Sequence, residues 1–372
     1  MVTPDATERQ VSIPQVFING RFFSQRITGV QRYARETILC LDELLANGEQ
    51  ENGRWRLLVP RGTPTPTFRH IFVEPVGRLR GHLWEQLELP WHARNGVLFS
   101  FGLIGPLAHG RQIITVHDAA IMRTPEAYDW RFRLWHRFLL RRLVPRVPWT
   151  IAVSRFSAAE AVECYGAPAE CVRMTTEGWQ HLDRVKPDES ILDRYGLRGE
   201  PFALAVSSPT PNKNFSAIAQ AIRILGNSAP LCVVAGVADP SIFRAAADGS
   251  DSIVRLGYVS DEALKALYQR ASCFIFPSFY EGFGIPLLEA MSCGCPVLAS
   301  TAPAVREVCG DVPLYFDPRR PEDLALRLRE VFADPALRAR MSSNGLERAR
   351  LYSWMESARL NLQVIREALC SI

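Results

Sequence analysis

Short apolar runs alternate with longer amphipathic stretches along the whole chain. Each run holds roughly three to seven residues, close to the length of a buried strand, and turn residues end most of them. The runs predicted as strands are 15–18, 56–59, 71–73, 97–100, 112–116, 150–154, 202–206, 231–236, 253–259, 273–276 and 296–299. The stretches predicted as helices are 28–45, 83–92, 131–146, 264–268, 322–333 and 353–369. Ser157, with Glu160 three residues later, is predicted to cap the start of a further helix. This alternation predicts an α/β fold built on parallel sheets.

Chain length sets the number of domains. With 372 residues, the chain is long enough for two domains that each bury a core. A charged stretch, 183–190, interrupts the pattern, and we place a domain boundary between residues 185 and 186. This connection is short, so the two domains are expected to hinge rather than to move independently.

The segment 276–296 has the strongest local pattern. A buried strand ends at Pro277, Gly282 and Gly284 permit a tight turn, and Pro286 suits the first turn of a helix. Such a helix start offers free N–H groups to a phosphate. Its two carboxylates have two interpretations.

In the first interpretation, Glu289 accepts hydrogen bonds from sugar hydroxyls such as those of a ribose, and Glu281 faces the group beyond the phosphates. In the second, Glu281 is a loop carboxylate and Glu289 a surface residue of an ordinary helix.

The run E-G-F-G-I-P-x-x-E-A-M-x-C-G-x-P-V, from Glu281 to Val297, resembles the signature of the family 4 retaining glycosyltransferases, and the likeness continues through Ala299-Ser300 and 306–308. This resemblance implies the GT-B fold, in which two Rossmann-like, doubly wound domains face each other across a cleft. It implies an acceptor-binding domain over 1–185, a nucleotide-sugar domain over 186–352, and a last helix, 353–372, that crosses back and is anchored by Trp354.

The resemblance also implies roles for individual residues. His117 follows a strand and would reach the donor sugar, while Lys213, in a P-x-K-N setting, would bind the diphosphate. The catalytic set would be His117, Glu281 and Lys213. The donor-binding set would be Gly29, Ser207, Ser208, Lys213, Tyr258, Val259, Glu281, Gly282, Phe283, Gly284, Ile285 and Glu289. Ser207 and Ser208 stand near the position where family members usually carry an arginine, so part of the positive charge at the phosphates is unaccounted for.

The implied reaction is transfer of a sugar from a nucleoside diphosphate to an acceptor hydroxyl with retention, without metal or other cofactor. We expect GDP-mannose to be the donor and mannose the sugar that is transferred. The expected acceptor is a glycan or a polyprenyl-diphosphate-linked molecule in bacterial surface polysaccharide synthesis. The alternative is a non-catalytic protein that binds nucleotide sugars. A nucleotide-sugar epimerase or dehydrogenase is disfavoured, because no compact G-x-G-x-x-G follows the first strand.

Charge and cysteine content bear on location. The net charge of +4 does not by itself argue for nucleic acid, and nine cysteines without metal-ligand spacing are expected to be reduced thiols. The N-terminal segment is too polar for a signal peptide, and no apolar run reaches the length of a membrane span. A cytoplasmic protein is expected.

The stretch 131–146 carries six arginines and no acid. In one interpretation it is a basic amphipathic helix at the inner face of the plasma membrane. In the other, the apolar row Trp130, Leu134 and Phe138 packs on the sheet and the arginines are solvated. Nucleic-acid binding is the weaker use of these charges, and no nucleic-acid partner is expected.

Overall fold

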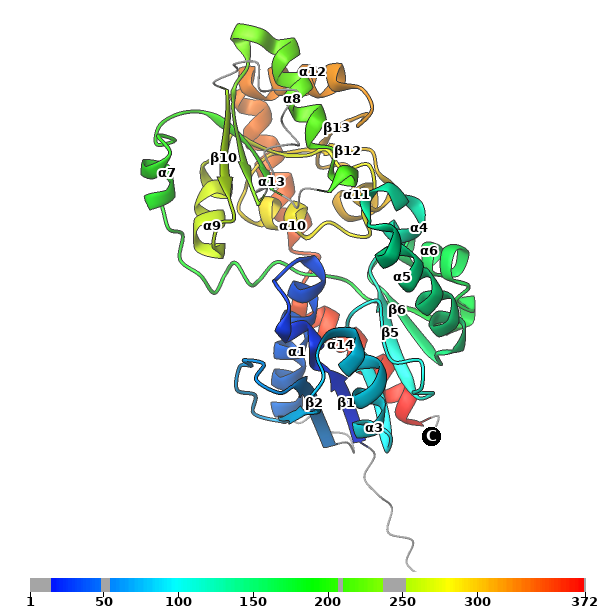
Figure 1. Ribbon diagram of the computed structural model, residues 1–372. Coiled ribbons are helices and arrows are strands. Elements are labelled where there is room, and N and C mark those ends of the chain that lie inside the picture. Colours follow the sequence, from blue (N-terminus) through cyan, green and yellow to red (C-terminus); the bar gives the residue numbers. More distant parts are fainter. Residues whose placement is uncertain (1–14, 48–53, 207–209, 237–251, 371–372) are drawn as a thin grey trace, which may run out of the picture.

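The computed structural model describes residues 15–47, 54–206, 210–236 and 252–370, and Figure 1 shows two α/β units, one above the other. Each unit is built on one parallel sheet, as the alternating pattern predicted. The two sheets share one strand order, in which the first strand lies in the middle and the chain winds outward on both sides. This is the order of a doubly wound Rossmann-like sheet.

The first sheet contains all the strands before residue 175. In spatial order they are β3 (Ile71–Val76), β2 (Arg54–Pro60), β1 (Gln15–Asn19), β4 (Gly96–Ser100), β5 (Gln112–Val116), β6 (Trp149–Ala152) and β7 (Val172–Met174). The helices of this unit are α1 (Gly29–Ala46), α2 (Gly81–Leu83), α3 (Leu89–His92), α4 (Ala120–Arg123), α5 (Trp130–Leu143) and α6 (Arg155–Tyr165). The predicted helix 83–92 is present, but a π-helical turn, Trp84–Glu88, separates α2 from α3.

The second sheet repeats the plan. Its strands, in spatial order, are β10 (Ile253–Gly257), β9 (Leu231–Ala235), β8 (Phe202–Val206), β11 (Cys273–Phe276), β12 (Val297–Ser300) and β13 (Leu314–Phe316). Its helices are α7 (Ser190–Arg194), α8 (Phe215–Leu225), α9 (Asp261–Arg270), α10 (Ile285–Ser292), α11 (Pro303–Cys309), α12 (Pro321–Ala333) and α13 (Pro335–Ala349). The central strands are buried along their length, in agreement with their continuous apolar sequences.

The last helix, α14 (Trp354–Cys370), returns to the first unit, where it packs against α1 and contacts β4 and β6. In Figure 1 the red end of the chain lies among the blue and cyan elements. Asn361 of α14 and Tyr33 of α1 are hydrogen-bonded at 3.0 Å in the interior. Trp354 is buried at the start of the helix, in the anchoring place that the family resemblance implied.

One local prediction was wrong, and so was one of the two interpretations of the stretch 131–146. The capping pattern predicted at Ser157 to Glu160 lies inside α6, whose N-cap is Ser154; its hydroxyl accepts from the Ser157 N–H at 2.9 Å. The apolar row of α5 does not pack on the sheet: Trp130, Leu134 and Phe138 are 59%, 63% and 46% exposed. The face that packs inward is instead His136, Leu139, Leu140 and Leu143.

In the part of the chain that is described, no helix combines the length and hydropathy needed to cross a bilayer. The nine cysteines are all free thiols, and five of them are buried. Burial raises the thiol pKa of Cys40 to about 12.

Candidate functional site

The predicted site residues follow strands near the middle of each sheet. Strand order reverses between β1 and β4 in the first sheet and between β8 and β11 in the second. Open parallel sheets bind ligands beyond the carboxyl ends of the strands at such reversal points. His117 follows β5, Lys213 lies after β8, and Glu281 lies after β11. The fold thus delivers all three to the edges where a ligand is expected.

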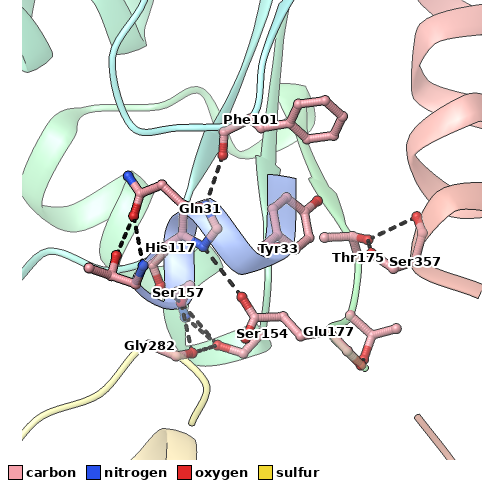
Figure 2. Close-up of polar contacts among 12 residues, drawn as sticks. Gln31, Tyr33, Phe101, His117, Ser154, Ser157, Thr175, Glu177, Gly282 and Ser357 are labelled. Atoms are coloured by element: carbon pink, nitrogen blue, oxygen red, sulfur yellow. Dashed lines mark hydrogen bonds and ion pairs between the residues drawn. The ribbon is translucent and has the colours of Figure 1, made fainter. Parts of the chain in front are cut away.

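His117 is buried and has two partners (Figure 2). Its Nε2 lies 2.9 Å from the carbonyl oxygen of Phe101, and its Nδ1 lies 3.4 Å from Oε1 of Glu177. A carbonyl oxygen only accepts hydrogen bonds, so Nε2 carries a proton and Nδ1 faces the acid. The ring of Tyr33 stands edge-on to the imidazole with centroids 5.0 Å apart. These contacts fix the orientation of His117.

Glu177 was not singled out by any sequence motif. It follows β7 and is buried, and burial raises the pKa of its carboxyl group although the contact with His117 opposes this. The carboxyl group therefore keeps its proton to higher pH than an exposed glutamate. A protonated Glu177 can donate a hydrogen bond to Nδ1 of a neutral His117. Sequence analysis did not identify this pair, because Glu177 and His117 are 60 positions apart in the chain and come together only in the folded protein.

Lys213 and Glu281 form an ion pair within the second unit. Lys213 Nζ lies 2.7 Å from both carboxylate oxygens of Glu281. Asn214, whose backbone is left-handed with φ 53°, donates through Nδ2 to the carbonyl oxygens of Pro277 and Pro318 at 3.1 and 2.7 Å. This amide ties the loop after β8 to the loop after β11. The lysine predicted for the phosphates and the first glutamate of the motif are thereby brought together.

The glycine turn leads into α10 as predicted. Gly284 adopts a left-handed φ of 108°, which favours glycine, and α10 begins at Ile285. Phe283 is buried, with its ring edge-on to Tyr352 at 5.7 Å between centroids. A Cβ placed on Gly29 would lie 3.9 Å from Cδ1 of Ile285, so the first helix of the chain starts beside this turn.

Gly282 is a point of direct contact between the two units (Figure 2). Its carbonyl oxygen accepts a hydrogen bond of 2.6 Å from the hydroxyl of Ser154. The hydroxyl of Ser157 lies within reach of the carbonyl oxygens of Gly282 and His117. A Cβ on Gly282 would lie 1.8 Å from the His117 oxygen, so a side chain does not fit here.

Two further contacts hold the same interface, and their residues had no predicted role. Glu307 of α11 accepts from the backbone N–H groups of Arg155 and Phe156 at 2.8 and 3.0 Å, at the N-terminus of α6. The hydroxyl of Tyr280 donates to Glu160 at 2.8 Å and accepts from the N–H of Ala119 at 2.9 Å. The segment 276–296, which resembles the family signature, thus contacts the first unit on both sides of Glu281.

Glu289, the second glutamate of the motif, is buried in α10. One oxygen lies 2.9 Å from Nε2 of His181, and the other accepts from the hydroxyl of Tyr268 at 3.0 Å. Burial acts to raise the pKa of this carboxyl group, but the hydrogen bond from His181, the charge of Arg32 and the hydrogen bond from Tyr268 lower it overall. Glu289 is therefore an ionised, internally supported carboxylate and not a surface residue of an ordinary helix.

The remaining predicted donor contacts are less enclosed. Tyr258 follows β10 and is 62% exposed, with the guanidinium of Arg26 4.9 Å from its ring centroid. Val259 is half-buried. Ser207 and Ser208 lie outside the described residues. Within the described ranges, no cluster of three or more His, Cys, Asp or Glu side chains is arranged to hold a metal ion.

Comparison with known families gives two matches that divide the chain between them. Residues 28–178 match the family described as Glycosyltransferase Family 4, and residues 189–348 match the family described as Glycosyl transferases group 1. The second match covers both glutamates of the motif and Lys213.

Curated relatives include two mannosyltransferases of Escherichia coli. O-antigen chain mannosyltransferase B is 32% identical over 256 residues, which is 66% of this chain and 67% of that protein. Serotype-specific mannosyltransferase WbdA is 27% identical over 273 residues, which is 68% of this chain but only 33% of that longer protein.

Solved structures with the same fold include one from Thermosynechococcus elongatus and one from Anabaena. Sucrose-phosphate synthase from Thermosynechococcus elongatus superposes with a TM-score of 0.75 at 20% identity, over 96% of this chain and 100% of that one. Anabaena Alr3699/HepE, in complex with UDP and glucose, gives a TM-score of 0.69 at 17% identity, over 97% and 100%.

Proposed function

The chain belongs to the glycosyltransferases of family 4 and group 1, which have the GT-B fold, and we propose that it transfers a sugar from a nucleoside diphosphate to a glycan hydroxyl with retention. The observation that carries this proposal is the Lys213–Glu281 ion pair. It lies beyond the carboxyl ends of the strands of the second sheet, close to the buried N-terminus of α10.

The choice of donor and acceptor rests on the relatives. The two Escherichia coli proteins are mannosyltransferases, and one of them builds an O-antigen chain. We therefore propose GDP-mannose as the donor and a glycan or polyprenyl-diphosphate-linked acceptor of a surface polysaccharide. A nucleoside diphosphate is also what the Anabaena structure holds.

The proposed chemistry assigns each residue a role. The bond from the anomeric carbon to the diphosphate breaks, and the bond to the acceptor oxygen forms on the same face. The acceptor proton passes to the departing phosphate oxygen. Lys213 has three N–H donors, so it can bind phosphate oxygens and Glu281 together. Glu281 would bind the sugar, with the imidazole of His117 held beside it by Phe101 and Glu177, and Glu289 would bind the ribose. This route needs no metal ion and no covalent intermediate.

We further propose that the acceptor is met at a membrane surface through α5. Trp130, Leu134 and Phe138 are exposed in a row, and the described part of the chain gives the arginines of this helix no carboxylate partner within 4.0 Å. A second exposed row, Leu83, Leu87 and Trp91, lies on the neighbouring helical segment, since the rings of His82 and His136 are 5.4 Å apart. Apolar side chains among arginines that have no carboxylate partner suit an anionic lipid surface.

Donor binding and transfer test the proposed function. Thermal-shift measurements with GDP-mannose, UDP-glucose, UDP-GlcNAc and dTDP-rhamnose identify the donor, and a transfer assay follows with that sugar. Lys213→Ala and Glu281→Ala should each reduce transfer by about 100-fold or more, the usual effect of removing one electrostatic stabiliser, with unfolding temperatures unchanged. Lys186→Ala and Glu200→Ala, at exposed positions, are the matched controls.

Wild-type turnover in both site variants would overturn the assignment. The same assays separate the alternative function: a non-catalytic protein would be stabilised by one of the four donors and would transfer none. That alternative was suggested by Ser207 and Ser208, which bring no positive charge to the phosphates.

A further inference from the structure

A buried chain of hydrogen bonds runs from the last helix to the second glutamate of the motif. The indole Nε1 of Trp354, at the start of α14, lies 3.2 Å from Nδ1 of His181. The other ring nitrogen of His181 lies 2.9 Å from Oε1 of Glu289 in α10. All three side chains are buried, at 1%, 3% and 6% exposure. Three separate parts of the chain therefore meet at one carboxylate.

The donors in this chain are determined by chemistry. An indole N–H donates and cannot accept, so Nδ1 of His181 must be the acceptor for Trp354. A neutral His181 therefore carries its proton on Nε2, which donates to Glu289. The Tyr268 hydroxyl, from α9, donates to the other oxygen at 3.0 Å. Trp354 thus selects the tautomer of His181 that supports the carboxylate.

The Glu289 carboxylate can accept further hydrogen bonds from a ligand. Two carboxylate oxygens accept about four hydrogen bonds in total, and His181 and Tyr268 use one on each oxygen. Two neighbouring hydroxyl groups, such as the 2′- and 3′-hydroxyls of a ribose, need one acceptor each. Each oxygen therefore keeps a lone pair that can accept from one of those hydroxyl groups, and the contacts with His181 and Tyr268 hold the carboxylate in place.

We propose that His181 is a positioning residue for Glu289: it fixes the carboxylate that binds the ribose of the donor, and Trp354 makes this support depend on the docking of α14. The proposal rests on the proposed function, because it takes Glu289 to be the ribose contact. It predicts that His181 contributes to discrimination of the ribose hydroxyls and not to the chemical step.

The test compares nucleotides with and without those hydroxyls. Dissociation constants are measured by calorimetry for GDP and UDP, each against its 2′,3′-dideoxy analogue, on the wild type and on His181→Phe, His181→Gln and Trp354→Phe. The wild type should bind the ribose form of its preferred nucleotide at least 10-fold more tightly. His181→Phe, which removes the donor, should bring that ratio close to one.

Rescue and kinetics separate positioning from folding. A glutamine at position 181 can still donate to Glu289, so His181→Gln should keep most of the ratio, and Trp354→Phe should give an intermediate value. In transfer assays, His181→Phe should raise the donor KM about 10-fold with kcat within about 3-fold of wild type. Trp179→Phe is the matched control, since its indole N–H donates at 2.8 Å to the Ala349 carbonyl oxygen and does not touch Glu289.

An unchanged ratio in His181→Phe would overturn the proposal, and so would a wild type that binds both forms equally while it transfers sugar. A wild type that binds neither nucleotide and transfers nothing would instead overturn the proposed function. Should His181→Phe not fold, the ratios of His181→Gln and Trp354→Phe decide: the proposal fails if Trp354→Phe equals wild type.

Discussion

The burial of Glu177 gives this single residue a measurable effect on stability. Burial raises the pKa of Glu177, and the nearby carboxylates of Glu281 and Asp118 add to this while His117 opposes it. The folded protein therefore holds this proton more tightly than the unfolded chain does. As pH rises from the ordinary glutamate value of 4.5 through the folded pKa, the unfolded chain loses the proton first and the fold loses stability.

Glu177→Gln should remove that loss, because glutamine cannot ionise and its amide can donate to Nδ1 of His117. Urea midpoints between pH 4.5 and 7.5 should fall less with pH in the variant than in the wild type. A tenfold difference in proton affinity corresponds to about 1.4 kcal/mol of free energy of unfolding. Glu74→Gln, in a half-exposed pair with Arg56, is the control. Parallel curves for wild type and Glu177→Gln would contradict the prediction.

For single residues, the sequence identified those that belong to a local motif. It did not identify those whose role depends on a partner far away in the chain. His117, Lys213 and Glu281 each follow a strand in a recognisable local setting, so their positions at the sheet edges could be predicted. Glu177 and His181 could not, because their partners lie 60 and 108 positions away and a buried pair has no local pattern.

The elements themselves were largely predictable. Strands such as β5, β8 and β11 are continuous apolar runs, and such runs fix a buried parallel strand almost without context. The three-residue strands β7 and β13 were missed because runs of that length carry no periodicity. The cap of α6 was placed three residues late, since both Ser154 and Ser157 suit an N-cap and only the fold selects one.

The exposed row on α5 leads to a prediction at the scale of one helix. The double variant Trp130→Ser, Leu134→Ser should lose most of its binding to vesicles containing phosphatidylglycerol, because it removes the apolar side chains that would enter the lipid surface. Arg141→Glu with Arg142→Glu should also weaken binding, by about 1 kcal/mol or more for each arginine, and 0.5 M salt should reproduce part of that loss.

The vesicle experiment has an internal control. Phe72→Ser removes an equally exposed aromatic side chain from β3, away from α5, and should bind vesicles as the wild type does. Binding by sedimentation that is unchanged in both α5 variants would contradict the membrane proposal. Equal binding to neutral phosphatidylcholine vesicles would contradict its electrostatic part.

For the whole molecule, the sequence predicted two parallel sheets and a last helix that returns to the first. It could not predict the contacts that join the two units. Glu307, Tyr280 and Ser154 each pair with a backbone N–H or carbonyl group more than 100 positions away, and every sequence offers such groups. Such contacts depend on how closely the two units approach, which no local pattern encodes.

The variant Gly282→Ala tests how closely the two units must approach each other. The backbone φ of Gly282 is not positive, so alanine meets no conformational strain, and the expected effect is steric alone. The variant should keep its donor-induced thermal shift but lose transfer by about 100-fold, and its radius of gyration from X-ray scattering should increase. Gly110→Ala, with nothing within 4 Å of the added Cβ, should behave as wild type. Undiminished transfer in Gly282→Ala would contradict this.

The contact at Gly282 also limits how far the spacing between the two units can vary. Where His117 and the loop of Glu281 come together, the atoms in touch belong to backbone carbonyl groups and to two short serine side chains, so few rotatable bonds lie between the two units. Longer side chains would let the gap vary by an ångström or more as rotamers change. At Gly282 the separation of His117 from the loop of Glu281 is therefore set by the path of the backbone and not by side-chain rotamers.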